Sequence, residues 1–558
     1  MSVPKGVVYH WAPIHNACYH GLLDQVKELI MNGADINSLD ISRNTPLHWA
    51  CRMGHMEVVL ALIDGGADVL ARDINQIIPL HDACQRGHTG IAMALLDRGV
   101  DVNIKGWKGR SPFFLACEKG RLDLALALLD RGAYIDAIDE IQFTPLLFTC
   151  SMGHKEVALA LVDKGADILA KNYQGVTSLH YACDEALSEV ALALMERGAD
   201  IFAQDIDEIT PLHYACSSGL MEVVLALIDG GADIFAKDNQ QMTPLHDACQ
   251  RGHTGVAMAL LDRGVDVNIK GWKGRSPFFL ACEQGRLDLA LALLDRGAYI
   301  DAIDEFQFTP LLFVCSHHKE MALALVNKGA DVHARSNLER TPLHIVIEKG
   351  YVEVALALME KGADVNAADN NQDTPLHLAC SLGQIDIVIA LIEKGANVHA
   401  LDLLRRTPLH LACEHGFREV GNVLIKKGAD VTLTDINGKK PHCDESMRSL
   451  FERLWRRTPL LTALHSDDMD LFQTILNDSA YDVNEDVSSD GSGWTILHTA
   501  AYLNKNIKRM NYILLLLNCE RVDKERTTKL KGLTASHVAC RRNDVEFAMA
   551  FLGHHYAR

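Results

Sequence analysis

Apolar residues in the stretch 43–72 (RNTPLHWACRMGHMEVVLALIDGGADVLAR) recur with the spacing of two short helices. Leu47, Ala50 and Cys51 follow one another at i, i+3 and i+4, which places them on one face of a first helix. A second helix is predicted over 56–64, with a buried face made of Val58, Val59, Leu62 and Ile63. Helices of this length are unstable alone in water. The stretch therefore needs neighbours that cover its apolar faces.

Polar and special residues mark the ends of both predicted helices. Thr45 stands at the N-cap, where its hydroxyl can accept a bond from a free backbone N–H of the first turn. Pro46 follows at the first helical position, where its missing N–H costs nothing. Gly54 is expected to end the first helix and Gly66 the second, and 67–69 leads into a tight turn.

The same pattern returns along the chain at a fixed interval. T-P-L-H or a close variant begins at residues 12, 45, 78, 111, 144, 177, 210, 243, 276, 309, 341, 374 and 407. Every step is 33 residues, except for the one of 32 between 309 and 341.

A period of 33 with T-P-L-H-x-A and a trailing G-A-D-φ-N is the pattern of the ankyrin repeat, and the chain resembles that family closely over about 9–440 and loosely over 458–552. The resemblance implies an all-α solenoid of helix–turn–helix units with protruding β-hairpin-like arms. It also implies that the concave face and the arm tips bind partner proteins.

We predict three parts in the chain: a main array of about 13 repeats over 1–440, a single-helix junction over 441–457, and a short stack of about three divergent repeats over 458–558. Within the main array, a block of five repeats is duplicated at 45–209 and 210–373.

The duplication is close. Residues 79–147 and 244–312 differ only at Ile91 against Val256, Lys119 against Gln284 and Ile141 against Phe306. The second copy has lost one residue and the stop glycine near Ser316–His318, so we expect a distorted turn between its two helices there.

Charge and composition narrow the partner class. The formal net charge of −19 disfavours nucleic acid, which binds clustered Lys and Arg. No run of 18 apolar residues is present, so no membrane insertion is expected. The chain is expected to be monomeric.

Most of the fifteen cysteines fall at one register of the first helix: Cys18, Cys51, Cys84, Cys117, Cys150, Cys183, Cys216, Cys249, Cys282, Cys315, Cys380, Cys413 and Cys540. Neighbouring copies should lie about 8–10 Å apart, farther than the 7 Å or so that a disulfide spans between Cα atoms. We interpret them as reduced core residues of a cytoplasmic protein, with the nucleus as an alternative location.

Candidate catalytic chemistry is scarce. Of 26 histidines, eleven occupy the fourth motif position (His15, His48, His81, His180, His213, His246, His344, His377, His410, His498 and His537). The resemblance implies that these side chains bond to the cap and nearby backbone. No GxxxxGK[ST], GxGxxG, CxxC or HExxH motif is present. We therefore assign no catalytic, metal-binding or cofactor-binding residue and predict that the protein is not an enzyme.

Two arm tips carry the sequence KGWKGR in place of the usual aspartate turn. The candidate partner-binding residues are Lys105, Trp107, Lys108 and Arg110, their copies Lys270, Trp272, Lys273 and Arg275, and, at a third tip, Leu404 and Arg405. Trp and Arg are preferred anchors of protein interfaces. In the alternative reading, the tryptophans fold back on a neighbouring arm and shield it.

Two rings follow each tryptophan tip, Phe113–Phe114 and Phe278–Phe279. We expect them to fill the inner layer of the stack.

Five asparagines suit a modification that the resemblance suggests. Ankyrin proteins are substrates of an asparagine hydroxylase that favours Leu eight residues before the Asn, and this spacing occurs at Asn37, Asn103, Asn268, Asn366 and Asn484. The same spacing fits asparagine that simply stabilises the arm.

Taken together, these features predict a non-catalytic scaffold or adaptor that binds other proteins. The alternative is a targeting or regulatory arm of a larger enzyme, channel or ubiquitin-ligase-type assembly.

Overall fold

The computed structural model describes residues 12–431 and 433–442, with a few isolated positions farther along the chain. The chain divides into two compact units, Met1–Phe306 and Gln307–Arg558. The described residues contain twenty-six α-helices and two 3-10 turns, and no strand. This is the all-α repeat solenoid that the periodicity predicts.

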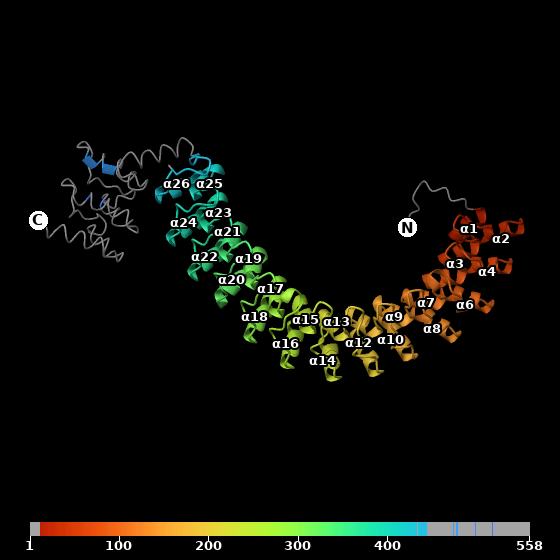
Figure 1. Cartoon of the computed structure of the whole chain (residues 1–558). Coiled ribbons are helices and arrows are strands. Elements are labelled where there is room, and N and C mark those ends of the chain that lie inside the picture. The colour runs from red at the N-terminus through yellow and green to blue at the C-terminus, as the bar shows by residue number, and fades with distance from the viewer. Residues whose placement is uncertain are drawn as a thin grey trace. The chain divides into compact units, whose positions relative to one another are not determined.

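The first unit is a row of stacked helix pairs (Figure 1). Its odd-numbered helices are the first of each pair: α1 (Pro13–His20), α3 (Pro46–Met53), α5 (Pro79–Arg86), α7 (Pro112–Glu118), α9 (Pro145–Ser151), α11 (Ser178–Asp184), α13 (Pro211–Ser218), α15 (Pro244–Arg251) and α17 (Pro277–Glu283). Its even-numbered helices are the second: α2 (Leu23–Met31), α4 (Met56–Asp64), α6 (Thr89–Asp97), α8 (Leu122–Asp130), α10 (Lys155–Asp163), α12 (Ser188–Glu196), α14 (Met221–Asp229), α16 (Thr254–Asp262) and α18 (Leu287–Asp295). Each odd-numbered helix packs against the next one, and the row they form is the inner side of the unit's curve.

The second unit continues the same pairing in its own described residues. Its helices are α19 (Pro310–His317), α20 (Lys319–Lys328), α21 (Pro342–Lys349), α22 (Val352–Glu360), α23 (Pro375–Ser381), α24 (Ile385–Glu393), α25 (Pro408–Glu414) and α26 (Arg418–Lys426).

The first helices begin with the cap chemistry expected from the motif, except α1 and α5, whose N-cap residues are Ala12 and Ile78. The Thr45 hydroxyl and backbone N–H both meet Nδ1 of His48, at 2.9 and 3.1 Å, and the opposite ring nitrogen bonds to the Ile77 carbonyl at 3.1 Å. The fourth-position histidine thus links its own cap to the next repeat. Gly54 ends α3 with a φ of 83°, the left-handed conformation that glycine adopts without strain.

The core consists of the apolar faces that the periodicity predicts. Leu47, Cys51 and Leu62 have no exposed surface. Every cysteine of the described residues up to Cys380 is a free, buried thiol, and Cys413 is buried as well. Burial raises the pKa of the Cys18 thiol to about 12, so it stays protonated and unreactive.

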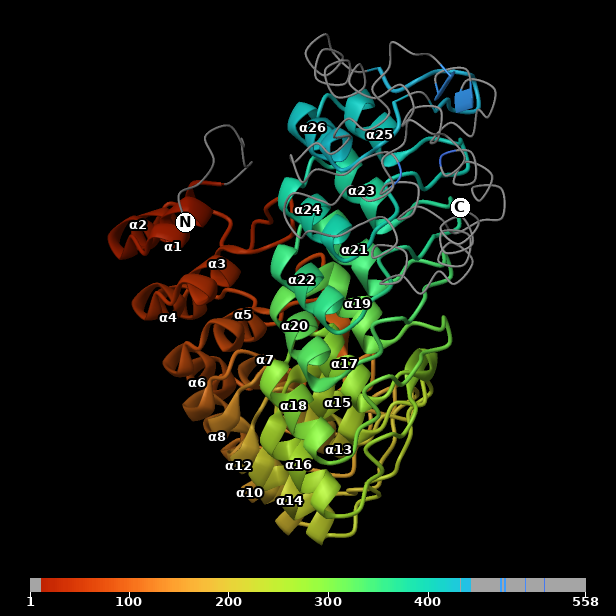
Figure 2. The same ribbon diagram turned by 90° about the vertical axis from the view of Figure 1, so that its left-hand side faces the viewer.

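The arms lie on the side of the odd-numbered helices away from the even-numbered ones (Figure 2). Each usual tip is a turn organised by an aspartate: Asp73 Oδ1 accepts from the N–H groups of Asn75 and Ile77, both at 2.8 Å. Neighbouring tips are joined by one backbone bond, as between Ile74 N–H and the Ser42 carbonyl at 3.1 Å. In the described residues the hairpin-like arms are therefore turns, with one isolated bridge, Lys171 to Thr177, in place of strands.

The lost residue in the second block changes a helix–helix turn as expected. In the first copy three residues separate α9 from α10, and Gly153 has a φ of 73°. In the second copy His318 alone separates α19 from α20, with a φ of −135°. The connection is made by one extended residue instead of a left-handed glycine.

Some predictions fall on residues outside the described part. The structure describes only scattered positions of the predicted junction at 441–457 and of the predicted stack at 458–558. It does not describe Asn484, a predicted hydroxylation site. These remain predictions. In the described chain, no helix has the length and apolar content that a bilayer crossing requires.

Candidate partner-binding site at the tryptophan tips

Both KGWKGR tips form the same tight turn in the first unit. Trp107–Gly109 and Trp272–Gly274 are short 3-10 turns in which Lys108 and Lys273 have left-handed φ values of 57° and 55°. Gly106 takes the place of the usual aspartate because a Cβ there would lie 2.8 Å from Nε2 of His81. The tip is therefore seated directly against the preceding repeat.

Arg110 connects the first tip to the next arm and to helix α7. Its side chain is 8% exposed and donates to Asp139 Oδ2 at 3.1 Å and to Glu118 Oε2 at 2.7 Å. Its guanidinium also lies over the rings of Phe114 and Phe148, at 4.9 and 4.6 Å.

Arg275 repeats this arrangement in the second tip, with Asp304 Oδ2 at 3.3 Å and Glu283 Oε1 at 2.7 Å. The sequence predicted both arginines to be partner contacts. In the free chain their side chains are buried, because the aspartate of the next arm pairs with each guanidinium. All four rings of Phe113–Phe114 and Phe278–Phe279 are buried in the inner layer, as predicted.

The tryptophans remain at the surface. Trp107 is 50% exposed and Trp272 is 43% exposed, so about half of each residue's surface is open to solvent. Each is stacked by the lysine that follows it, with Lys108 Nζ 4.4 Å from the Trp107 ring centre and Lys273 Nζ 3.7 Å from that of Trp272. The second tip has an added ring, because Phe306 replaces Ile141 and lies 5.7 Å from Lys273 Nζ.

The remaining predicted contacts are also exposed. Lys105 and Lys270 lie at the start of their tips, and Nζ of Lys105 is 3.5 Å from the Ile138 carbonyl. In the second unit, Leu404 is 48% exposed and Arg405 is exposed at the next position of its own turn.

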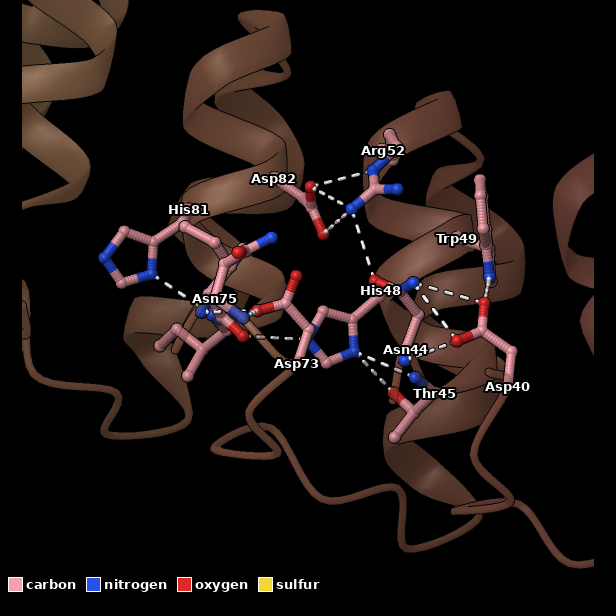
Figure 3. Close-up of polar contacts among 12 residues, drawn as sticks. Asp40, Asn44, Thr45, His48, Trp49, Arg52, Asp73, Asn75, His81 and Asp82 are labelled. Atoms are coloured by element: carbon pink, nitrogen blue, oxygen red, sulfur yellow. Dashed lines mark hydrogen bonds and ion pairs between the residues drawn. The ribbon is translucent and has the colours of Figure 1, made fainter. Parts of the chain in front are cut away.

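A pocket of about 170 Å³ opens beside Trp107. Its wall includes Arg52, Asp82 and Leu115 from three successive first helices. Arg52 pairs with Asp82, Nε to Oδ1 at 2.8 Å, and lies 4.7 Å from the Trp49 ring (Figure 3).

The Trp49 ring is fixed in turn, because its Nε1 donates to Asp40 Oδ2 at 3.0 Å. The guanidinium and the carboxylate in the wall of the pocket are thus backed by a ring that is itself held in place.

Burial shifts the pKa values of two side chains in the wall of the pocket. It raises the pKa of the Asp82 carboxyl, and Arg52 acts in the opposite direction. It also lowers the pKa of His81 to about 4, so this ring is neutral at physiological pH.

Sequence reasoning missed the acidic member of this wall. The fifth motif position of the first helices carries a large apolar or aromatic residue in the neighbouring repeats (Trp49, Leu115, Phe148, Tyr181, Tyr214 and Leu280), but aspartate at 82 and 247. A carboxylate in an otherwise apolar register was a visible signal. Its partner was hidden, because Arg52 belongs to the preceding repeat and becomes Ser217 in the second block.

The side chains at the described candidate hydroxylation sites form hydrogen bonds to the next repeat. Asn103 Nδ2 donates to the Gly132 carbonyl at 3.0 Å, and its Oδ1 accepts from Tyr134 N–H at 2.7 Å. Asn268 and Asn366 make the same pair of bonds, and Asn37 accepts from Asp68 N–H at 2.8 Å. Their regular spacing thus has a structural cause, and their modification stays a prediction.

Comparison with known proteins adds the family. The model for ankyrin repeats (3 copies) matches residues 4–73, 71–139, 138–205, 203–271, 278–369 and 366–435. The chain belongs to the ankyrin-repeat family. Ankyrin repeats are generally protein–protein interaction modules, and the chain's repeats are of this class.

Among solved structures, the crystal structure of the human ASB11 ankyrin repeat domain is similar to this chain. The two are 27% identical, the alignment covers 39% of this chain and 98% of that domain, and the TM-score is 0.36. Among curated proteins, none matches the chain.

Within the described residues, no group of three or more His, Cys, Asp or Glu side chains is arranged to hold a metal ion.

Proposed function

We propose that this ankyrin-repeat protein is a non-catalytic scaffold or adaptor, and that it holds partner proteins with the inner face of its first unit and the two tryptophan tips. The observation that carries the proposal is the exposure of Trp107 and Trp272 on turns of identical sequence. A half-exposed tryptophan on a rigid support is a good anchor, because it buries a large area on binding and loses little conformational freedom.

Rigid support comes from the buried arginines. Arg110 and Arg275 each connect their tip to the next arm and to a first helix through carboxylates. Five repeats separate the two tips, or about 50 Å at roughly 10 Å per layer. A partner with two copies of one motif would gain avidity from such a pair.

The reduced cysteines support a reducing compartment, so we place the protein in the cytoplasm, with the nucleus as the alternative. The net charge of −19 favours proteins over nucleic acid as partners.

The test compares binding by the full chain with binding by Trp107→Ala, Trp272→Ala and the double variant. Captured proteins are identified by mass spectrometry, and the affinity of each purified partner is then measured by calorimetry. We expect each single change to weaken binding at least tenfold. For a partner with two copies of the motif, we expect the double change to weaken binding by more than the product of the two losses measured with a single-copy partner.

Phe202→Ala is the matched control, since it removes a ring that is 61% exposed but lies away from the tips. If the double variant retains the native affinity for every partner, the tips are not the binding site.

A further inference from the structure

The two duplicated blocks differ at one charged contact of the inner face. In the first block Arg52 makes two bonds to Asp82, Nε to Oδ1 at 2.8 Å and Nη2 to Oδ2 at 3.2 Å. In the second block the aspartate is kept as Asp247, and the arginine position is Ser217.

The ring and its supporting carboxylate have counterparts around Asp247, whereas Asn44, which also accepts a bond from Arg52, is replaced by Ile209. Tyr214 replaces Trp49, and its hydroxyl lies 3.4 Å from Oδ2 of Asp205, just as the Trp49 indole is held by Asp40. The second block therefore keeps an aromatic ring and a carboxyl in the same register while lacking the guanidinium.

Asp247 has no cation within ion-pair distance among the described residues, although it is only partly exposed. Two charged groups act on it: Asp238 from the preceding arm, and exposed Arg251 one turn farther along its own helix. Burial is the larger influence, and it raises the pKa of the Asp247 carboxyl to about 8. An opposite charge would stabilise the ionised form.

This chain places a guanidinium on the aromatic residues of its first helices more than once. Arg52 lies 4.7 Å from the Trp49 ring and pairs with Asp82. Arg110 lies 4.6 Å from the Phe148 ring and pairs with Asp139. Tyr214 and Asp247 are a third ring and carboxyl of this kind, with no arginine of their own.

We propose that Tyr214 and Asp247 form a binding site for an arginine side chain of the partner protein, at the place that Arg52 fills in the first block. The inference rests on the proposed function and names the partner's chemistry. Arginine fits better than lysine, because a planar guanidinium lies on a ring while donating two parallel bonds to one carboxylate. The net charge of −19 also favours approach of a basic segment.

The probe for this site is N-acetyl-arginine-N-methylamide, with the citrulline analogue as an uncharged control of the same shape. Binding to the full chain is measured by ligand-observed NMR. We expect saturable binding that Asp247→Asn weakens at least tenfold, and that the citrulline analogue fails to reproduce. Ser217→Arg should abolish it equally, because the chain then fills the site as Arg52 does.

Asp229→Asn is the matched control, since it removes an exposed carboxyl at the end of α14 that pairs with Arg263. It should leave probe binding unchanged. The proposal is overturned if the native chain shows no saturable binding, if the citrulline analogue binds as well, or if Asp247→Asn and Ser217→Arg bind like the native chain. These outcomes do not depend on the tryptophan tips, so they separate this site from the test of the proposed function.

Discussion

Replacing Arg110 by methionine tests whether the buried arginine is what holds the first tryptophan tip. Methionine keeps most of the volume that lies over Phe114 and Phe148 but removes the charge. Asp139 would then lose both bonds to its Oδ2 atom, at 3.2 and 3.1 Å, while its side chain has no exposed surface.

The magnitude follows from which carboxylate is left unpaired. Glu118 is 12% exposed and keeps Lys119 at 2.7 Å, so it contributes little to the loss. Asp139 keeps the N–H groups of Ile141 and Phe143 on Oδ1 but becomes a buried charge without a cation, which costs about 3–5 kcal/mol. The matched control is Arg131→Met, which breaks a surface pair with Asp97 whose side chains are 41% and 63% exposed, and which should cost about 0–1 kcal/mol.

The assay is native-state hydrogen exchange, because a repeat protein opens locally before it unfolds globally. Arg110→Met should speed exchange of the Gly106 and Glu140 amides, which close the tip and join it to the next arm, at least about a hundredfold. Arg275→Met should do the same in the second block. If Arg110→Met and Arg131→Met change exchange to a similar extent, the support attributed to the buried pair is wrong.

Two further predictions concern stability. Asn268→Ala removes the bonds to Gly297 and Tyr299 and should cost about 1–2 kcal/mol, seen as faster exchange of the Tyr299 amide, whereas Phe202→Ala in the same register should change its neighbours little. The pKa of Asp247 is raised to about 8 from an ordinary value of 3.8, so between about pH 4 and 8 the folded chain holds a proton that the unfolded chain has already released. Stability should therefore fall as the pH rises through this window. Asp247→Asn should remove that slope and be more stable at pH 7 by about 4 kcal/mol in denaturant titrations, and an unchanged slope would contradict the assignment.

Local chemistry made the repeat predictable. Thr45, Pro46 and Gly54 act within one turn or one cap of their own helix, so their roles follow from spacing alone. The cysteine register followed from the same periodicity, since a residue repeated every 33 positions occupies the same layer of every unit.

The candidate site was only partly predictable, because its decisive contacts cross from one repeat to the next. The sequence marked the tips of Trp107 and Trp272, whose exposure depends on a local turn. It did not show that Arg110 would turn inward, because its two carboxylates lie 8 and 29 residues away in the chain. The pairing of Arg52 with Asp82, 30 residues apart, was hidden for the same reason.

The sequence by itself determined the period, the helix ends, the apolar faces and the tips where the pattern changes, because each of these depends on residues within a few positions of one another. Only the tertiary structure decided which charges are buried, which are paired and which ring stays exposed. Those properties depend on the stacking of neighbouring repeats, where burial and the nearest opposite charge come from residues about thirty positions away.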